Sequence, residues 1–461
     1  MASESISKSV VWQLLGKFAL QGVAFFTTPI FTRILSPANY GTIALYTSWS
    51  SILMVILSLQ TYGAIATARI KFSKDEMPAY LSSTLSISII AYLIFFILII
   101  CFRNFFANLF KLDKILVSIL LIHSFANYMI AFFVAYLDQY KKVIKSSIIS
   151  ISSAVVSILL SLTFVLIFEN KVYGKIFGQA IPALSLAFVL LIVIYYRGKC
   201  FWNRAYNKYC ILLTMPLVVH GLGHMVFTQA DRILLQRYQN EAVLGVYSVV
   251  YSLCSVLSIV FTAVNTAWGP FYYDFKKQGN TEAIAEHSKR YIKIITLIFV
   301  GFILLSFDVF KLMAPAPYWK GLKIIPIFVA SFYFSYLYLF PVGYEVYYEK
   351  TKLMPIATIL VATINIILDL ILIPRYAAIG AVFATLIAQI LLFVFHFIVA
   401  RFIIKEKFDY KFTFFLVPII VILTCVGVSY FIIDLYFIRW LLFGFIAAYV
   451  FYDALKQRSI F

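Results

Sequence analysis

The sequence predicts an all-α integral membrane protein with about 14 transmembrane helices: two six-helix lobes related by a parallel repeat, plus two extra C-terminal helices. Three observations predict this class. Of the 461 residues, 63% are hydrophobic and only 12% are charged, about half the charged fraction of a soluble domain. Apolar runs long enough to cross a bilayer follow one another, with only short polar segments between them. Motifs of the first half also recur in the second half.

Each expected span is a run of about twenty or more mostly apolar residues. The first run is too long for a signal-peptide core and lacks a small-residue cleavage site, so we expect it to be a retained helix. The spans define two lobes, 1–200 and 201–405, and a C-terminal helix pair, 406–461. In chain order the spans are 10–32, 38–66, 78–102, 115–137, 144–168 and 174–196, then 210–236, 242–268, 289–312, 322–346, 353–373 and 378–402, and finally 412–433 and 437–455.

A duplication of roughly 200 residues explains the two lobes. Six spans separate equivalent positions, an even number, so both copies insert in the same sense. Their pseudo-twofold axis then runs along the membrane normal, and a central cavity is expected between the lobes. The equivalent pairs are Arg33 and Arg232, 199 residues apart, Gly41 and Gly245, 204 apart, and Gly174 and Gly380, 206 apart.

The charge of the loops predicts the orientation. Of the 38 Lys and Arg residues, about 24 lie in the loops on the side of the N-terminus and about 13 on the other side. A bias of this kind over short loops places both termini in the cytoplasm. The net charge of +19 therefore reflects topology and attraction to anionic lipid headgroups, not nucleic-acid binding.

No pattern of a catalytic site is present in the sequence. We find no Gly-rich phosphate loop, no Asp-x-Asp pair and no nucleophile–His–acid set. The outer loops are too short for the charged motifs of a membrane glycosyltransferase or polymerase. The five cysteines show no paired spacing and are interpreted as small apolar residues of the helices. We therefore expect neither an enzyme nor a bound cofactor.

Polar residues follow one face of the first span. Gln13, Lys17, Gln21, Thr28 and Thr32 stay within roughly 100° of one another on a helical wheel. Lys17 could extend its chain to the cytoplasmic headgroups. The polar face continues deeper than Lys17, however, and ionisable groups inside a span usually face a cavity. This favours a cavity position for Lys17.

The seventh span carries His220, His224 and Asp231 at i, i+4 and i+11, which places them on one helix face. Two histidines alone do not make a zinc site, which needs a third and a fourth ligand. We interpret the face as a polar cavity wall whose histidines can titrate near neutral pH. Asp231 with Arg232 is alternatively a charge pair at the outer interface.

Two further i, i+4 pairs that contain acidic residues lie in the second half. Asn365 and Asp369 are also i, i+4, and Asp369 is close enough to Pro374 to be interfacial. Glu345 and Glu349 precede two lysines and are interpreted as a solvated helix end.

Three motifs carry a family resemblance that spans nearly the whole chain. Residues 31–46 (FTRILSPANYGTIALY) resemble the opening signature of Wzx-type flippases, which export O-antigen and capsule repeat units. Residues 231–235 (DRILL) with 245–249 (GVYSV) are similar to the second-half opening, and residues 374–385 (PRYAAIGAVFAT) to the junction of the eleventh and twelfth helices. The superfamily also contains drug/cation extruders and lipid II flippases.

The resemblance implies a two-lobed transporter of the bacterial inner membrane that works by alternating access. Its cargo would be an oligosaccharide on undecaprenyl pyrophosphate, moved to the outer leaflet for O-antigen, capsule or another surface polysaccharide. The pyrophosphate needs cations in place of its lost hydration. Other partners implied are membrane lipids, a coupling proton or cation, and a polysaccharide polymerase and chain-length regulator. The cation candidates are Lys17, Arg33, Arg69 and Arg232.

One departure argues against a peptidoglycan precursor as cargo. The span 242–268 has no cation, unlike the lipid II flippase pattern. A drug/cation extruder remains the alternative, and it would need a buried carboxylate to exchange a proton or sodium ion. Asp231 or Asp369 could serve, but the middles of the N-terminal spans carry no acidic residue.

The orientation can be tested directly. Single cysteines replacing Lys141, Lys276 and Lys405 should react with impermeant thiol reagents only from the cytoplasmic side, because all three lie in loops that the charge bias places inside. The five native cysteines are first exchanged for serine. Labelling of any two positions from outside would overturn the map.

Overall fold

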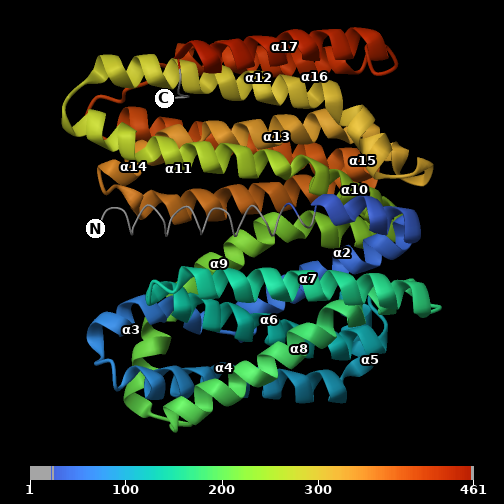
Figure 1. Cartoon of the computed structure of the whole chain (residues 1–461), viewed down its shortest axis with the longest axis vertical. Coiled ribbons are helices and arrows are strands. Elements are labelled where there is room, and N and C mark those ends of the chain that lie inside the picture. Colours follow the sequence, from blue (N-terminus) through green and yellow to red (C-terminus); the bar gives the residue numbers. More distant parts are fainter. Residues whose placement is uncertain (1–21, 23–24, 458–461) are drawn as a thin grey trace. The chain divides into compact units, whose positions relative to one another are not determined.

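The computed structural model describes residue 22 and residues 25–457, and every regular element in that part of the chain is helical (Figure 1). The first expected span, 10–32, lies mostly outside these residues, as do Gln13, Lys17 and Gln21. Packing divides the chain into two compact units, Met1–Gly245 and Val246–Phe461. These units are defined by contacts, whereas the predicted lobes are defined by repeated motifs. The units therefore do not test the predicted lobe boundary near residue 200, which stays a prediction.

The first unit is a bundle of long helices that begins with helical residues 25–34. The elements that follow are α2 (Pro37–Leu57), the 3₁₀ turn η1 (Thr61–Ala64), α3 (Ile65–Lys71), α4 (Met77–Cys101), α5 (Arg103–Phe110), α6 (Lys114–Gln139), α7 (Val143–Ile167), α8 (Lys171–Gly198) and α9 (Arg204–Tyr238).

The helix α10 (Glu241–Cys254) crosses from the first unit into the second. The remaining elements are α11 (Val256–Lys277), α12 (Thr281–Met313), η2 (Ala316–Ile324), α13 (Ile325–Leu337), α14 (Leu339–Tyr347), η3 (Thr351–Leu353), α15 (Met354–Ile398), η4 (Val399–Ile403), α16 (Phe412–Ser429) and α17 (Tyr436–Gln457).

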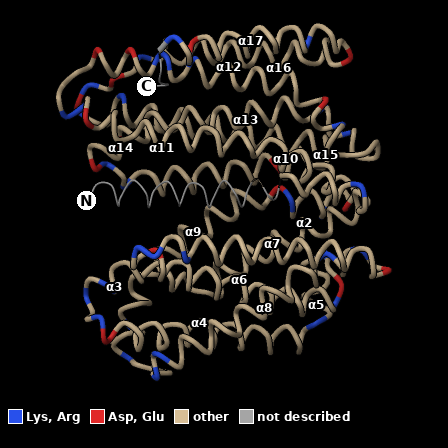
Figure 2. Tube along the Cα trace, viewed as in Figure 1, with Lys and Arg blue, Asp and Glu red and all other residues tan. Residues whose placement is uncertain are grey.

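Twelve helical segments of the described chain are long and apolar enough to cross a membrane. One of them contains two expected spans, 353–373 and 378–402, joined in α15 across a kink at Ala377 (φ 49°, ψ −131°). Pro374 precedes the kink and removes a helical hydrogen bond. Figure 2 shows the charged residues of both units gathered at helix ends. The prediction of an all-helical, multi-spanning membrane protein is confirmed.

Polar side chains at helix starts satisfy backbone N–H groups that have no partner inside the helix. Ser36 accepts from the N–H of Asn39 at 3.2 Å, with Pro37 in the first turn. Asp113 accepts from the N–H groups of Ile115 and Leu116 at 2.9 and 2.8 Å. Such caps are required at membrane boundaries, where an unsatisfied backbone group would be costly.

The glycines Gly41 and Gly245 make a reciprocal contact inside the first unit. A Cβ at Gly41 would overlap the carbonyl of Glu241, and a Cβ at Gly245 would overlap the carbonyl of Pro37. Each would also lie 3.0 Å from the backbone nitrogen of the other glycine. Gly41 thus contacts Glu241, and its equivalent Gly245 contacts Pro37, which is the equivalent of Glu241. Such reciprocal contacts are typical of a twofold relation. They agree with the 204-residue offset found in the sequence.

The second pair of equivalent glycines, Gly174 and Gly380, also has one role in both copies. A Cβ at Gly174 would lie 2.6 Å from the carbonyl oxygen of Phe164, at the end of the preceding helix. A Cβ at Gly380 would overlap the carbonyl of Leu372, at the equivalent place in the second unit. Both glycines allow two consecutive helices to cross with their backbones in contact.

Replacing Gly41 by alanine should lower the stability of the protein by about 1–3 kcal/mol, since the new methyl group would overlap backbone that cannot rotate away. The measurement is the midpoint of thermal unfolding in detergent. Gly427→Ala is the matched control, because nothing lies within 4 Å of a Cβ at Gly427, also in a helix. Equal midpoints for the two variants would contradict the close crossing.

Candidate functional site

Two of the predicted cations lie in the first unit and bind carbonyls of their own helix. Arg33 donates to the carbonyl oxygen of Pro29 at 2.7 Å and is exposed. Arg232, only 9% exposed, donates to the carbonyl oxygen of Thr228 at 2.7 Å and to Oε1 of Gln229 at 2.9 Å. Each guanidinium thus makes at least one hydrogen bond within its own helix.

Arg69 has a structural role. Its guanidinium donates to the carbonyl oxygen of Gln139, the last residue of α6, and lies over the ring of Tyr140 at 5.8 Å. A cation at a helix C-terminus is stabilised by the carbonyl groups that have no partner there. The contact therefore links α3 to the end of α6.

The residues of the predicted polar face of α9 differ in solvent exposure. His220 and His224 are exposed, whereas Asp231 is buried at 5% exposure. The Asp231 carboxylate accepts from the backbone N–H of Arg232 at 2.9 Å. No group of three or more His, Cys, Asp or Glu side chains that could hold a metal occurs in the part of the chain that the structure describes.

The second unit buries two of the candidate residues. Asn365 and Asp369 in α15 are 1% and 0% exposed. The amide nitrogen of Asn365 makes no hydrogen bond within the described residues. A buried polar group without a partner is costly, so this amide is a candidate for binding.

The interpretation of Glu345 as part of a solvated helix end is wrong. Glu345 is 0% exposed, and its Oε1 lies 2.8 Å from Nδ1 of His396, which is 2% exposed. Glu349 is exposed, as expected. The error has a tertiary cause: His396 comes from α15, 51 residues later, and no local pattern reveals such a partner.

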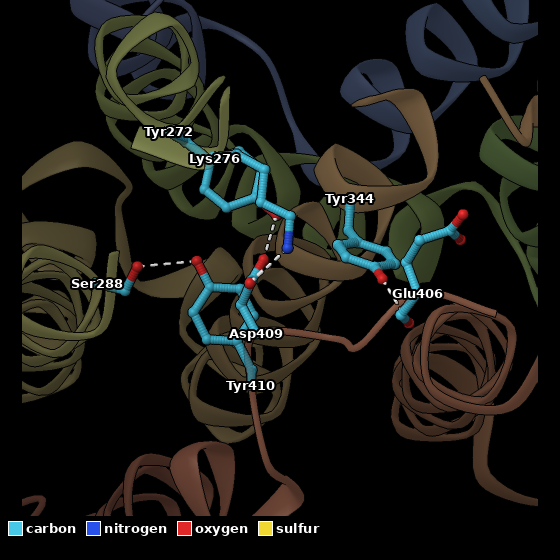
Figure 3. Close-up of polar contacts among 7 residues, drawn as sticks. All are labelled: Tyr272, Lys276, Ser288, Tyr344, Glu406, Asp409 and Tyr410. Carbon is cyan, nitrogen blue, oxygen red and sulfur yellow. Dashed lines mark hydrogen bonds and ion pairs between the residues drawn. The ribbon is translucent and has the colours of Figure 1, made fainter. Parts of the chain in front are cut away.

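A polar cluster joins the connector 404–411 to the helices of the second unit (Figure 3). Asp409 lies at its centre, 2.6 Å from Nζ of Lys276 in α11, and accepts from the hydroxyl of Tyr272 at 2.8 Å. The side chains of Lys276 and Asp409 are 10% and 5% exposed. Removing one partner of such a pair would leave a charge poorly solvated, so the pair holds the connector in place.

Two tyrosines extend the cluster to neighbouring elements. The hydroxyl of Tyr410 lies 2.8 Å from that of Ser288 in α12, and Tyr344 in α14 donates to the carbonyl oxygen of Glu406 at 2.7 Å (Figure 3). Burial raises the pKa of Tyr410, so its hydroxyl stays protonated at neutral pH. The connector that leads to α16 is thus bound to three helices, which indicates a structural role.

The first unit contains a cavity of about 430 Å³ between α2, α6, α7 and α8, called the polar cavity below. Fourteen described residues line it; nine of these are polar, and none of them is Asp, Glu, Lys or Arg. At its edge the hydroxyl of Tyr46 lies 3.1 Å from Nδ1 of His123. The other polar residues of the lining are Thr47, Ser50, Asn127, Ser150, Ser153, Ser157 and Gln179.

Lys175 is a cation that the sequence interpretation did not single out. It lies one turn inside α8 and is partly buried, and its Nζ is 3.2 Å from the ring centroid of Phe31. It has no acidic partner among the described residues. The sequence could have identified Lys175 as a candidate by its position inside the expected span 174–196, because a lysine within a span usually has a function. The next residues on this face are Gln179 and Ala183, which line the polar cavity.

Comparisons with known proteins agree with this architecture. The model of the family described as "Polysaccharide biosynthesis protein" matches residues 6–275. A Haemophilus influenzae protein described as "Uncharacterized membrane protein" is 22% identical over 396 residues, covering 82% of this chain and 94% of that protein.

Two solved structures show what the fold is similar to. "Lipid II flippase MurJ, inward closed conformation" has a TM-score of 0.73 at 18% identity and covers 97% of this chain and 99% of its own. An inward-facing multidrug resistance MATE family transporter of the MOP superfamily has a TM-score of 0.59 at 15% identity, covering 85% of this chain and 98% of its own. The fold is therefore similar to that of a lipid II flippase and to that of a MATE family transporter.

Proposed function

The chain belongs to the polysaccharide biosynthesis protein family, and from this premise we propose that it is a flippase for lipid-linked oligosaccharides. It would move repeat units on undecaprenyl pyrophosphate from the inner to the outer leaflet of a bacterial inner membrane by alternating access. The observation that carries the proposal is the family match over residues 6–275 on a MOP-superfamily fold. O-antigen, capsule and other surface polysaccharides are all compatible destinations.

Cations of the first unit support the proposal. A pyrophosphate that leaves water needs charged donors to replace its hydration. Arg33, Arg232 and Lys175 lie in this unit, and Lys175 is partly buried without an acidic partner in the described chain. Lys17 stays a candidate on the evidence of the sequence. Arg69 is a weaker one, because the end of α6 already engages its guanidinium.

The chemistry of the polar cavity does not favour the alternative, a drug/cation extruder. A cationic drug that leaves water needs a negative partner. The part of the polar cavity lining that the structure describes includes no carboxylate. The buried acids Asp231 and Asp369 are on other helices, α9 and α15.

Replacing Lys175 by glutamine should lower the rate of lipid-linked oligosaccharide flipping in proteoliposomes at least tenfold, because the substrate phosphates would lose a charged donor. Lys17→Ala should have an effect of the same kind, and arginine at either position should restore part of the rate. Lys114→Gln is the control, since Lys114 is exposed at the start of α6. Full activity of both Lys175→Gln and Lys17→Ala would remove the cation argument.

Energy coupling is assigned to the polar face of α9. The sequence has no ATP-binding motif, and a unit charge crossing 100 mV is worth about 2.3 kcal/mol. His220, His224 and Asp231 would bind the coupling proton or cation, with Asn365 and Asp369 as the second set of candidates.

The triple exchange His220→Gln, His224→Gln, Asp231→Asn should abolish the response of flipping to an imposed pH gradient or membrane potential. Binding of the lipid-linked substrate should persist, because the exchange leaves the cationic residues in place. Flux and binding are measured on the same vesicles. If the triple variant follows pH and potential as the parent does, this face is only a polar wall.

A further inference from the structure

We propose that the polar cavity binds a neutral sugar unit. The inference deepens the proposed function, on which it rests, by giving one part of the cargo a place within the first unit. It is carried by the depth of the cavity, by the chemistry of its lining and by polar side chains that have no partner.

The depth is the first argument. Tyr46 and His123 lie nine residues from the starts of α2 and α6, and Gln179 lies eight residues from the start of α8. At 1.5 Å per residue, all three are about 12–14 Å from the helix ends, near the middle of a hydrocarbon layer about 30 Å thick. Polar groups at that depth are costly and mark a pathway or binding site more often than they stabilise a fold.

The second argument is the unused hydrogen-bonding capacity. Elsewhere in the bundle many serines and threonines donate to a carbonyl of their own helix, as Thr163 does to Leu159 at 3.0 Å. Five polar side chains of the lining form no hydrogen bond in the part of the chain that the structure describes. They are Asn127, Ser150, Ser153, Ser157 and Gln179.

The third argument concerns charge. Hydroxyl and amide groups both donate and accept, which matches the hydroxyl groups of a sugar. Among the described residues no lysine or arginine lines the cavity, so these residues would not compensate a carboxylate or phosphate for its lost hydration. The described lining holds no aspartate or glutamate either, which disfavours a metal ion or an organic cation. The ligand class that remains is neutral and polyhydroxylated.

The size is adequate for such a ligand. The cavity volume of about 430 Å³ lies within the range of about 300–1,000 Å³ that holds small molecules. This volume would hold more than ten water molecules of about 30 Å³ each. A sugar ring that displaced them would replace their hydrogen bonds with those of the five free side chains.

Binding is tested on the purified protein in detergent by saturation-transfer NMR. The neutral probes are D-glucose, D-galactose and N-acetyl-D-glucosamine, and D-glucuronate serves as the charged counterpart of glucose. At least one neutral sugar should receive saturation, and glucuronate at least tenfold less. Ser153→Leu should abolish the signal, because leucine fills the cavity. Ser152→Leu is the matched control, since Ser152 is the exposed neighbour outside the lining and its exchange should change nothing.

A second variant covers the case in which Ser153→Leu fails to fold. Gln179→Met keeps the length of the side chain and removes its amide, so the sugar signal should fall several-fold while elution on size exclusion stays that of the parent. The proposal is wrong if no neutral sugar gives a signal that these variants reduce, or if glucuronate binds as well as glucose.

Flipping assays in proteoliposomes separate this inference from the proposed function. Ser153→Leu should lower the flux of lipid-linked oligosaccharide at least tenfold, with Ser152→Leu at the parental rate. If the parent flips no such lipid while the sugar signal persists, the proposed function fails and the sugar site stands. Equal flux in both variants would show that the cavity lies off the transport path, and the inference would fail while the function stands.

Discussion

The hydrocarbon of a bilayer offers no hydrogen-bonding partner, and this constraint shapes the whole molecule. Every backbone N–H and C=O within it must be satisfied by the chain itself, which leaves helices as the solution for a chain of this composition. The side chains of Ser36 and Asp113 accept hydrogen bonds from backbone N–H groups at helix starts. Charged residues gather at helix ends in both units (Figure 2). Buried polar side chains inside the bundles are correspondingly informative, because each needs a partner within the protein.

Close backbone crossings follow from the same constraint. Between helices in lipid the hydrophobic effect adds little, so van der Waals contact between backbones becomes important. Gly41 and Gly245 allow such contact through their missing side chains, and Gly174 and Gly380 do so at equivalent places in the two units. Because the equivalent glycines have equivalent neighbours, the duplication has preserved specific packing as well as sequence.

Polar groups in the two units serve different purposes. In the second unit the cluster around Asp409 is satisfied internally, and it fixes the connector between η4 and α16 (Figure 3). In the first unit the polar cavity contains five side chains that form no hydrogen bond with other described residues. Satisfied polar networks make a fold rigid, whereas unsatisfied ones in a cavity need a ligand or water. For this reason we assign a structural role to the cluster around Asp409 and a binding role to the polar cavity.

The sequence by itself determined the membrane class and the all-helical fold, because hydrophobicity and helix length are local properties set by the bilayer. It also predicts an internal duplication from the repeated motifs, whereas the joining of the spans 353–373 and 378–402 in one kinked helix came from the structure. Only the tertiary structure decided the environments of individual polar residues. Glu345 looked solvated beside its lysines but is buried against His396, and Lys175 looked like the start of a span but lies over Phe31. The polar cavity combines residues from four helices, up to 137 positions apart. Such partners meet only through packing, and no local period in the sequence records them.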